Sequence, residues 1–450
     1  MRFVHADDPA RRLLLGYCLN LHPARDLDEF LRRTGAVAAP LRERLGVRGR
    51  FGVGPWMGAA LVDELLRSPA ALRRLVEFLR DERLEPFTWN AFPYGEFHSA
   101  GVKESVFEPR WSDPARATYT RQVAQLALEL AELLEPDAPA SRAHGDERSV
   151  DPRFADPRFA ESRAHVSIST HTGGHSTRWS DPDEAAASGL LDSTARALAK
   201  LSLAHGRRAR LGLEPEPRAN LSSQGDLRAF WDRARAELRA RPDSVAWLAA
   251  WTTHMGACLD LCHSAVEFED DPLERLGSSA HGGVPIVKVQ VTNALRLEAP
   301  ARHPRAVEAL LALDEPRWLH QTNALVHDGV LRAGDLPEVR AALSGPERER
   351  WLGAAEWRTH FHVPVDLAAA EGLSTTFALT RRTLDRLLST PAAEDLHLEI
   401  ETYTWSALGG ALAGGTGAAS GDDALVAGLE REYRALLPIL EGHGWRRAEA

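Results

Sequence analysis

The sequence predicts an α/β fold, a single (β/α)8 TIM barrel in which a parallel sheet closes on itself under a layer of helices. Two observations predict it. Segments that alternate apolar and polar residues take turns along the chain with segments of helical, 3.6-residue period. Ionisable residues also share one side of the later strand candidates, near their carboxyl ends, where barrel enzymes hold their active sites.

Eight segments have the length and apolar character of strands, and turn residues bound them. They are residues 13–21, 50–57, 86–92, 165–170, 210–214, 256–262, 285–292 and 396–402. Helical periodicity fills the intervals between them. Ser68 and Asp113 each precede a proline, which predicts an N-cap followed by the first residue of a helix. The last helix is expected at about residues 423–440.

Three segments depart from this alternation. Residues 137–164 are polar and repeat the five residues DPRFA, which predicts a flexible surface insertion. About a hundred residues separate the last two strands, so we expect residues 296–357 to form an insertion over the barrel mouth. Residues 409–421 are rich in Gly and Ala and suggest a flexible loop. The interpretation is one barrel domain over residues 1–450.

The charge balance narrows the possible partners. Lys and Arg total 54 against 64 Asp and Glu, a formal charge of −10, which offers no general attraction to nucleic acid. There is no apolar segment long enough to span a membrane and no basic, apolar leader. The three cysteines are too few for a disulfide framework. We therefore expect a cytoplasmic protein that acts on a small-molecule metabolite.

The parity of each late strand predicts which side chains face the barrel interior, because neighbouring residues of a strand point to opposite faces. Leucines and valines occupy one parity and polar residues the other. The residues expected inside are Glu214, Glu216, Asp260, Lys288, Gln290, Glu399 and Glu401, with His263 just beyond its strand.

Burying several carboxylates costs free energy unless a partner compensates their charge. One divalent cation can compensate several of them at once. His360 and His362 add two imidazoles that point to one side of an extended segment. The predicted metal ligands are Glu214, Asp260, His263, Gln290, His360, His362 and Glu401. Zinc, manganese, magnesium and cobalt all remain possible.

Some of these residues could instead stabilise the fold. Glu214 could pair with Lys288 or an arginine, and Lys288 could form a buried salt bridge instead of acting in catalysis. With eighteen histidines, an HxH spacing also arises by chance. Polar residues near the carboxyl ends of the early strands could equally bind the substrate or pack within loops. The predicted substrate-binding residues are Asn20, His22, Asn90, His98, Lys103, Glu216 and Glu399.

The ordered set Glu214, Asp260-x-x-His263, His360-x-His362 and Glu401 resembles the xylose-isomerase-like TIM barrel superfamily of sugar isomerases, ketose 3-epimerases and a zinc-dependent AP-endonuclease branch. Eight phrases are more narrowly similar to the EboE family, the barrel member of the bacterial Ebo cluster, which is associated with metabolite traffic. They are GYCLNLHP (16–23), NAFPYG (90–95), VKE (102–104), SIST (167–170), LEPEP (213–217), WLHQT (318–322), HFHVP (360–364) and ETYTW (401–405).

The superfamily resemblance implies a ligand set. It places a Glu on the fifth strand, an Asp and a His after the sixth, a His on the seventh and a Glu on the eighth. Glu214, Asp260, His263 and Glu401 match these positions, and Gln290 stands where the seventh-strand His is expected. His360 and His362 would correspond to the extra pair of the endonuclease branch, which makes a second metal conceivable.

Three functions follow from these residues. The first is a metal-dependent isomerase or epimerase acting on a small polar or carbonyl metabolite, in which Glu214 and Glu401 exchange protons and Lys288 or His263 stabilises the enediolate oxygen. The second is a non-catalytic metabolite-binding protein, favoured by Gln290 and by the association with traffic, with other Ebo-cluster proteins as partners. The third is a metal-dependent hydrolase, which two closely spaced cations would favour.

Overall fold

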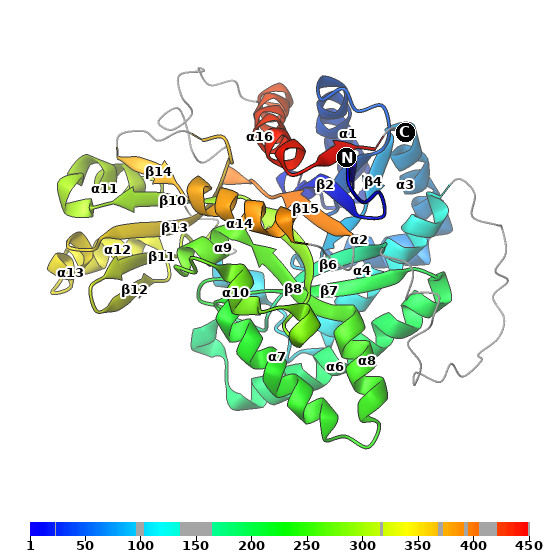
Figure 1. Ribbon diagram of the computed structural model, residues 1–450, viewed down its shortest axis with the longest axis horizontal. Helices are drawn as coiled ribbons and strands as arrows, with labels where there is room; N and C mark the ends of the chain where they lie inside the picture. Colours follow the sequence, from blue (N-terminus) through cyan, green and yellow to red (C-terminus); the bar gives the residue numbers. More distant parts are fainter. Residues whose placement is uncertain are drawn as a thin grey trace.

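The computed structural model describes residues 1–22, 24–95, 103–135, 164–315, 318–367, 372–390, 395–404 and 421–448. Two sheets organise these residues. One is a barrel with its covering helices, and the other is a smaller sheet inserted before the last barrel strand. Figure 1 shows the smaller sheet beside the barrel, on the left of the view. All but the last residue of the predicted insertion at 137–164, and all but the last residue of the loop at 409–421, lie outside the described residues.

The barrel confirms the predicted (β/α)8 fold. Within the described residues, its strands pair in parallel around a nearly closed barrel, from β2 through β15 to β5 on one side and from β2 through β3 to β4 on the other. The third barrel strand consists of two pieces, β4 and β5, on either side of Phe87, so each piece pairs with a different neighbour. The strands are β2 (Arg12–Cys18), β3 (Phe51–Gly54), β4 (Leu84–Pro86), β5 (Thr88–Asn90), β6 (His165–His171), β7 (Arg208–Glu214), β8 (Met255–Asp260), β9 (Ile286–Val291) and β15 (Leu396–Ile400).

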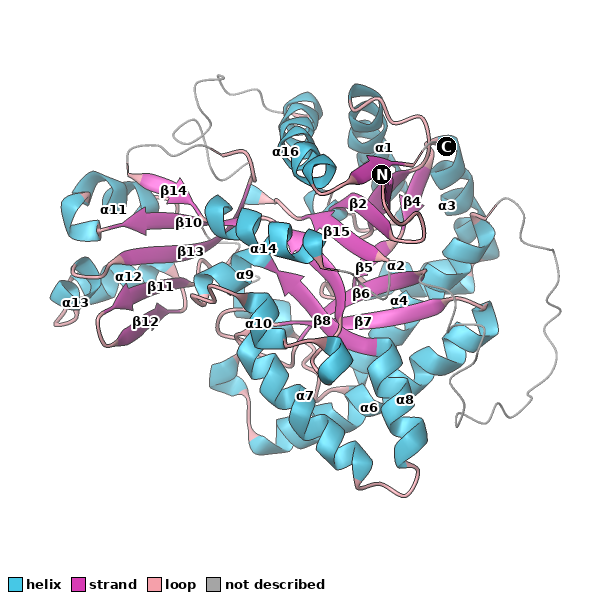
Figure 2. Cartoon of the chain, in the orientation of Figure 1, coloured by secondary structure: helices cyan, strands magenta, loops and turns pink. Residues whose placement is uncertain are grey.

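Helices cover the outside of the barrel (Figure 2). The side chains of Ser68 and Asp113 accept hydrogen bonds from the first helical turns, as their N-cap positions predict. The helices are α1 (Leu27–Arg44), α2 (Ala59–Arg67), α3 (Pro69–Asp81), α4 (Pro114–Leu133), α6 (Asp181–His205), α7 (Gln224–Arg239), α8 (Ser244–His254), α9 (Leu261–Val266), α10 (Pro272–Leu276), α14 (Phe377–Ser389) and α16 (Asp422–Gly442). Short 3-10 turns are η1 (Leu19–Leu21), η2 (Lys103–Phe107), η3 (Ser176–Arg178), η4 (Ser279–His281) and η5 (Pro300–Arg302). None of the helices among the described residues is long and apolar enough to cross a membrane.

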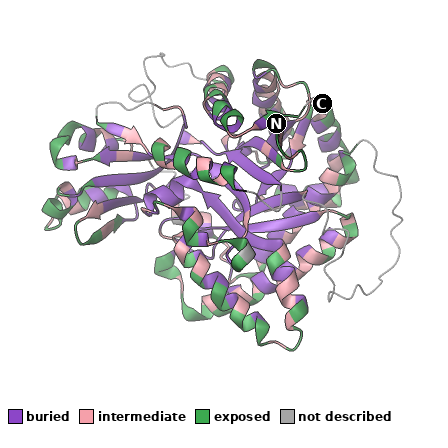
Figure 3. Cartoon of the chain, viewed as in Figure 1, coloured by how far each residue is buried: buried purple, intermediate pink, exposed green. Residues whose placement is uncertain are grey.

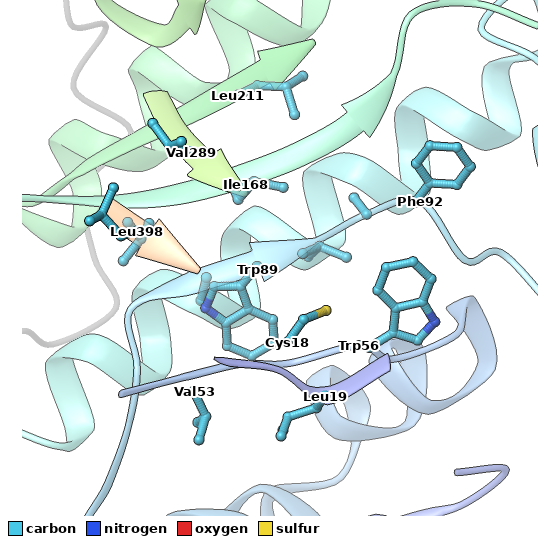
Figure 4. Close-up of a cluster of buried hydrophobic side chains, with 14 of the residues drawn as sticks. Cys18, Leu19, Val53, Trp56, Trp89, Phe92, Ile168, Leu211, Val289 and Leu398 are labelled. Atoms are coloured by element: carbon cyan, nitrogen blue, oxygen red, sulfur yellow. The ribbon is translucent and has the colours of Figure 1, made fainter. Parts of the chain in front are cut away.

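A continuous apolar core lies between the barrel strands and the covering helices. Val53, Ile168, Leu211, Val289 and Leu398 come from five different barrel strands and are all less than 3% exposed. Figure 4 shows these side chains in one cluster, and Figure 3 shows the barrel strands buried along their length. This core holds the strand ends in place, so the polar residues at those ends are presented on a rigid frame.

A short antiparallel ribbon joins the two ends of the chain. Strand β1 (Arg2–His5) pairs with both β2 and β16 (Trp445–Arg447), which places the first and last described residues side by side (Figure 1). The sequence did not predict this ribbon because β1 and β16 are only four and three residues long.

The inserted sheet is antiparallel and has its own apolar core, which includes Leu295, Trp357 and Phe361. Its strands run from residue 293 to residue 375, so the predicted insertion at 296–357 lies within a longer segment. Among the described residues it contains β10 (Asn293–Glu298), β11 (Thr322–Val326), β12 (Gly329–Ala333), β13 (Glu356–Val363), β14 (Leu373–Thr375), α11 (Pro304–Leu311), α12 (Leu336–Leu343) and α13 (Arg348–Leu352). That the barrel and the insertion form one domain stays a prediction.

Candidate metal centre

A small cavity of about 60 Å³ lies where the carboxyl ends of the barrel strands meet the inserted sheet. The barrel contributes carboxylates and one imidazole, and β13 contributes two imidazoles. Its lining is Trp56, Phe92, Lys103, Val106, Glu214, Glu216, His263, Trp318, Leu319, His360, His362, Glu401 and Tyr403. The cavity therefore combines most of the predicted metal ligands with an aromatic wall.

Three buried carboxylates meet beside this cavity. Glu214 ends β7, Asp260 ends β8 and Glu401 follows β15, and one oxygen of each lies within 4.8 Å of the others. Their inward direction is the one that strand parity predicts. Within the described part of the chain, Glu214 Oε2, Asp260 Oδ2 and Glu401 Oε2 are buried and make no hydrogen bond. Burying carboxylate oxygens without hydrogen-bond donors costs free energy. We therefore expect these three carboxyl groups to bind a cation or protons.

The remaining oxygens of two of these carboxylates are held by neighbours. Asp260 Oδ1 accepts a hydrogen bond from the backbone N–H of His263 at 2.8 Å and so caps α9. Glu401 Oε1 accepts one from Asn20 Nδ2 at 3.3 Å. These contacts orient the carboxylates and leave their second oxygens directed at one another.

Burial and mutual repulsion raise the pKa values of the three carboxyl groups. Burial, with the nearby charge of Asp260, raises the pKa of Glu214 to about 8. Burial also raises the pKa of Asp260 and, helped by Glu214, holds the pKa of Glu401 well above its usual range. A bound cation would reverse these shifts, because it stabilises the ionised form.

The imidazoles of His263, His360 and His362 meet at their Nε2 atoms. The Nε2–Nε2 distance is 3.1 Å between His263 and His360 and 3.2 Å between His263 and His362. At the opposite side of each ring, Nδ1 faces an oxygen: the carbonyl of Pro215 for His263, that of Glu401 for His362, and the amide of Gln321 for His360. A carbonyl oxygen can only accept, so each Nδ1 carries the proton.

The Nε2 lone pair of His263 therefore faces the Nε2 lone pairs of both His360 and His362. Burial lowers the pKa of His263 to about 3 and that of His362 to about 4, and it holds the pKa of His360 well below its usual value. Burial therefore favours the neutral form of each ring, with its proton on Nδ1. Three converging lone pairs repel one another unless a cation lies among them.

These residues fit a divalent metal. A tetrahedral ion with bonds of about 2.0 to 2.1 Å would hold two nitrogen ligands about 3.3 to 3.4 Å apart, close to the distances from His263 Nε2 to the Nε2 atoms of His360 and His362. Asp260 Oδ2 lies 3.9 Å from His362 Nε2 and supplies a nearby oxygen donor. Asp260 belongs both to a set with His263 and His362 and to the set with Glu214 and Glu401. The donor atoms could accommodate one ion, or two that share Asp260.

Lys288 and Glu399 lie deeper in the barrel, outside the lining of the cavity. They form a fully buried ion pair with Nζ and Oε2 2.5 Å apart. Burial opposes the charge of Lys288, but the carboxylate of Glu399 outweighs it and raises the pKa of Lys288 above its usual value. The buried salt bridge that the sequence left open for Lys288 is therefore present, and a catalytic role for Lys288 stays a prediction.

Asn90 and Gln290 belong to the same interior layer. Asn90 Nδ2 lies 3.3 Å from Oε1 of Glu399, and Asn90 Oδ1 accepts a hydrogen bond from Ser169 at 2.6 Å. Gln290 Oε1 accepts from Cys258 Sγ at 3.0 Å. Neither amide lines the cavity, so the assignments of Asn90 to substrate and of Gln290 to metal stay predictions.

The other predicted binding residues differ in position. Glu216 and Lys103 line the cavity, and Lys103 Nζ lies 2.6 Å from Asp335 Oδ2 of the inserted sheet. Asn20 contacts the cavity through Glu401, as described above. His22 Nε2 lies 3.2 Å from the hydroxyl of Tyr17. His98 lies outside the described residues.

Gly54 is the neighbour that makes room for the buried ion pair. A Cβ atom at this position would lie 1.6 Å from Oε1 of Glu399. We expect Gly54→Ala to lower the free energy of unfolding by about 1 to 3 kcal/mol through overpacking. Urea denaturation would measure it, with Gly189→Ala as the control. Gly189 lies in α6 with open space around it, so alanine there should be neutral or stabilising. Equal stabilities for the two variants would contradict the packing argument.

Two features of the site were not predicted from the sequence. The first is its aromatic wall of Trp56, Phe92, Trp318 and Tyr403, which come from four distant segments. Tyr403 lies against His362 with ring centroids 4.8 Å apart, and against Trp318 at 5.1 Å. Figure 4 shows Trp56 and Phe92 at the edge of the barrel core. Periodicity could not have grouped them, because the contacts arise only in the folded chain.

The second is Glu432, a buried carboxylate on α16. Its Oε2 accepts hydrogen bonds from Thr402 Oγ1 at 2.8 Å and from the backbone N–H of Val365 at 3.0 Å. It therefore ties the segment that carries Glu401 to the segment that follows His362. Burial raises the pKa of Glu432 to about 8. A signal existed in the sequence, because Glu432 interrupts the apolar stripe of the last helix.

Comparisons with known proteins add little to this geometry. Neither a model of a protein family nor a curated protein matches the chain. Among solved structures, it is similar to a 3-keto-D-glucoside 4-epimerase from E. coli, with 15% sequence identity and a TM-score of 0.32. The match covers 62% of this chain and 79% of the epimerase chain. The barrel fold rests on the observed strand pairing, and the EboE resemblance stays a prediction.

Proposed function

We propose that the chain is a divalent-metal-dependent enzyme of the isomerase or epimerase type, acting on a small polar or carbonyl metabolite. The observation that carries the proposal is the meeting of three neutral imidazoles and three unpaired carboxylate oxygens beside one cavity. Nitrogen-rich coordination favours zinc or cobalt over magnesium and manganese. We assign the ion to His263, His360, His362 and Asp260.

This assignment leaves Glu214 and Glu401 for proton transfer. Both line the cavity, and they come from different barrel strands, so they can address one substrate carbon from two directions. A bound cation would polarise a carbonyl oxygen and an adjacent hydroxyl. One of the two groups, in its ionised form, would remove a proton from carbon, and the other, in its protonated form, would return one. Trp318 and Tyr403 cover the site and limit the access of water.

Two other functions remain as alternatives. A carrier would bind the metabolite without turnover, and Gln290 in place of an imidazole favours that function. A metal-dependent hydrolase needs two neighbouring cations, and the sharing of Asp260 between two candidate ligand sets favours it. The EboE resemblance supports a finer proposal, in which the protein works in cytoplasmic metabolite traffic with other Ebo-cluster proteins. Failure to co-purify with any of them under mild conditions would count against that role.

One experiment separates the three functions. The protein is loaded with zinc or cobalt, its metal content is measured, and it is incubated in D₂O with a panel of aldoses, ketoses and keto sugars. An isomerase or epimerase should bind about one ion per chain and introduce deuterium at a carbon of its substrate. Binding without deuterium exchange indicates a carrier. Two ions per chain with hydrolysis of a test ester or glycoside indicates a hydrolase. Either result would overturn the proposal.

The raised carboxyl pKa values also predict how stability depends on pH. Glu214 and Glu216 have pKa values near 8 because of burial, against a usual 4.5, so the native state binds protons more tightly than the unfolded state. Their contribution to stability therefore falls as pH rises from 4.5 to 8. The lowered pKa values of His263 and His362 act oppositely, but only below their usual 6.5.

We expect the melting temperature of the metal-free protein to fall between pH 6.5 and pH 8. Saturating cobalt should reduce this fall, because the cation stabilises the ionised carboxylates. Thermal unfolding followed by circular dichroism, with and without cobalt, measures both effects. A melting temperature that does not fall across this range without metal would show that the carboxyl groups are already ionised in the native state.

A further inference from the structure

We propose that Gln321 is a positioning residue of the metal site: it holds the ring of His360 so that its Nε2 faces Nε2 of His263. Gln321 directly precedes β11 of the inserted sheet and is fully buried. The inference rests on the proposed function, because it concerns the metal site assigned there. It adds a residue that touches neither the cavity nor a metal.

The orientation of the Gln321 amide follows from its partners. Its Nε2 lies 3.1 Å from Glu216 Oε1 and 3.1 Å from the carbonyl oxygen of Pro217. The carbonyl can only accept, so the amide nitrogen must be the atom that faces it. The amide oxygen then faces His360 Nδ1 at 2.5 Å and must accept its proton. The backbone N–H of His360 also donates to the carbonyl oxygen of Gln321, at 2.8 Å.

His360 depends on this side chain more than the other two histidines depend on theirs. The Nδ1 atoms of His263 and His362 donate to backbone carbonyls, which no substitution removes. The nearest carboxylate oxygen of Glu216 lies 3.9 Å from His360 Nδ1, too far for a hydrogen bond. The Gln321 amide contacts both residues, with its nitrogen at Glu216 and its oxygen at His360. Without it, the proton of His360 could move to Nε2 and occupy the point where the three lone pairs meet.

The test measures cobalt binding by the full-length, metal-free protein. Loss of such a hydrogen bond to a ligating imidazole typically weakens metal affinity by about 10- to 100-fold. We expect Gln321→Leu to raise the dissociation constant for Co²⁺ by that factor and to alter the visible absorption of the bound ion. Gln321→Glu keeps an acceptor for His360 Nδ1, so it should retain more affinity than the leucine variant.

Asn323→Leu is the matched control. Asn323 is also a buried amide that joins the inserted sheet to the barrel, two residues further along the same segment. Its Nδ2 donates to the carbonyl of Val266 and to Glu267 Oε1, both at 3.0 Å, and in neither case to a histidine. We expect both leucine variants to lower the melting temperature, since each leaves buried acceptors without a donor. Only Gln321→Leu should change the affinity and spectrum of cobalt.

The possible failures can be told apart. Wild-type protein that binds no Co²⁺ would overturn the metal site, and with it this inference. Wild-type protein that binds Co²⁺, together with a Gln321→Leu variant of unchanged affinity and spectrum, would overturn the inference alone. The same holds if Asn323→Leu weakens binding as much as Gln321→Leu, because the loss would then reflect only the docking of the inserted sheet.

Discussion

Replacing Glu401 with glutamine is expected to slow deuterium exchange into the substrate by about 10²- to 10⁴-fold, the usual contribution of one proton-transfer group. Glutamine has nearly the same shape as glutamate, and its amide oxygen can still accept the hydrogen bond from Asn20 Nδ2. The variant loses the carboxylate charge and, with it, the ability to take up and return a proton. Its rate should be measured in D₂O with the metabolite that the wild-type protein turns over.

The metal content of the Glu401→Gln variant distinguishes a role of Glu401 in proton transfer from a role as a metal ligand. If Glu401→Gln keeps its full metal content and loses exchange, Glu401 acts on protons. If it loses the metal as well, Glu401 is a ligand, and the assignment of the ion to the imidazoles and Asp260 is incomplete. A variant that keeps both metal and exchange would show that Glu401 has neither role.

Glu269→Gln is the control for burial of a carboxyl group. Glu269 is also buried, and burial raises its pKa to about 7. Its oxygens accept the backbone N–H groups of Gln224 and Gly225 at the start of α7, away from the cavity. This variant should keep its rate of exchange. A comparable loss in both variants would point to a general loss of structure.

Strand parity predicted the barrel half of the site. Leucines on one parity of a parallel strand must face the covering helices, so Glu214 and Asp260 had to point inward. The eight predicted strands coincide with the observed barrel strands to within a few residues, because each is a short apolar segment bounded by turns. The alternation of apolar and polar residues was therefore enough to predict those features of the site that depend only on the direction of a single side chain.

Contacts between segments far apart in the chain could not be predicted from the sequence. The pairing of Lys288 with Glu399 depends on which strands are neighbours in the barrel and on their register, since β9 and β15 lie side by side, and parity specifies neither. The inserted sheet has short antiparallel strands between helices, so its pattern did not stand out from a long connection. Nothing in the sequence distinguishes Gln321 from other polar residues. Only the folded structure shows that its side chain faces His360.

The buried ion pair gives the largest expected effect on stability. Replacing Lys288 with methionine removes the positive charge and leaves the Glu399 carboxylate buried beside the neutral amide of Asn90. Breaking such a pair from one side typically costs about 3 to 5 kcal/mol, because the remaining charge is uncompensated. We expect the free energy of unfolding of Lys288→Met, measured in urea, to fall by this amount.

Two comparisons identify the cause of that loss. Lys103→Met also removes a lysine from an ion pair, but Lys103 is about one-third exposed, so the expected loss is about 1 kcal/mol or less. Adding Glu399→Gln to Lys288→Met removes the orphaned charge and should restore part of the stability, because a neutral amide is cheaper to bury than a carboxylate. If the double variant is less stable than Lys288→Met, the cost lies in lost packing around both side chains. The interior layer would then support the site through its shape more than through its charge.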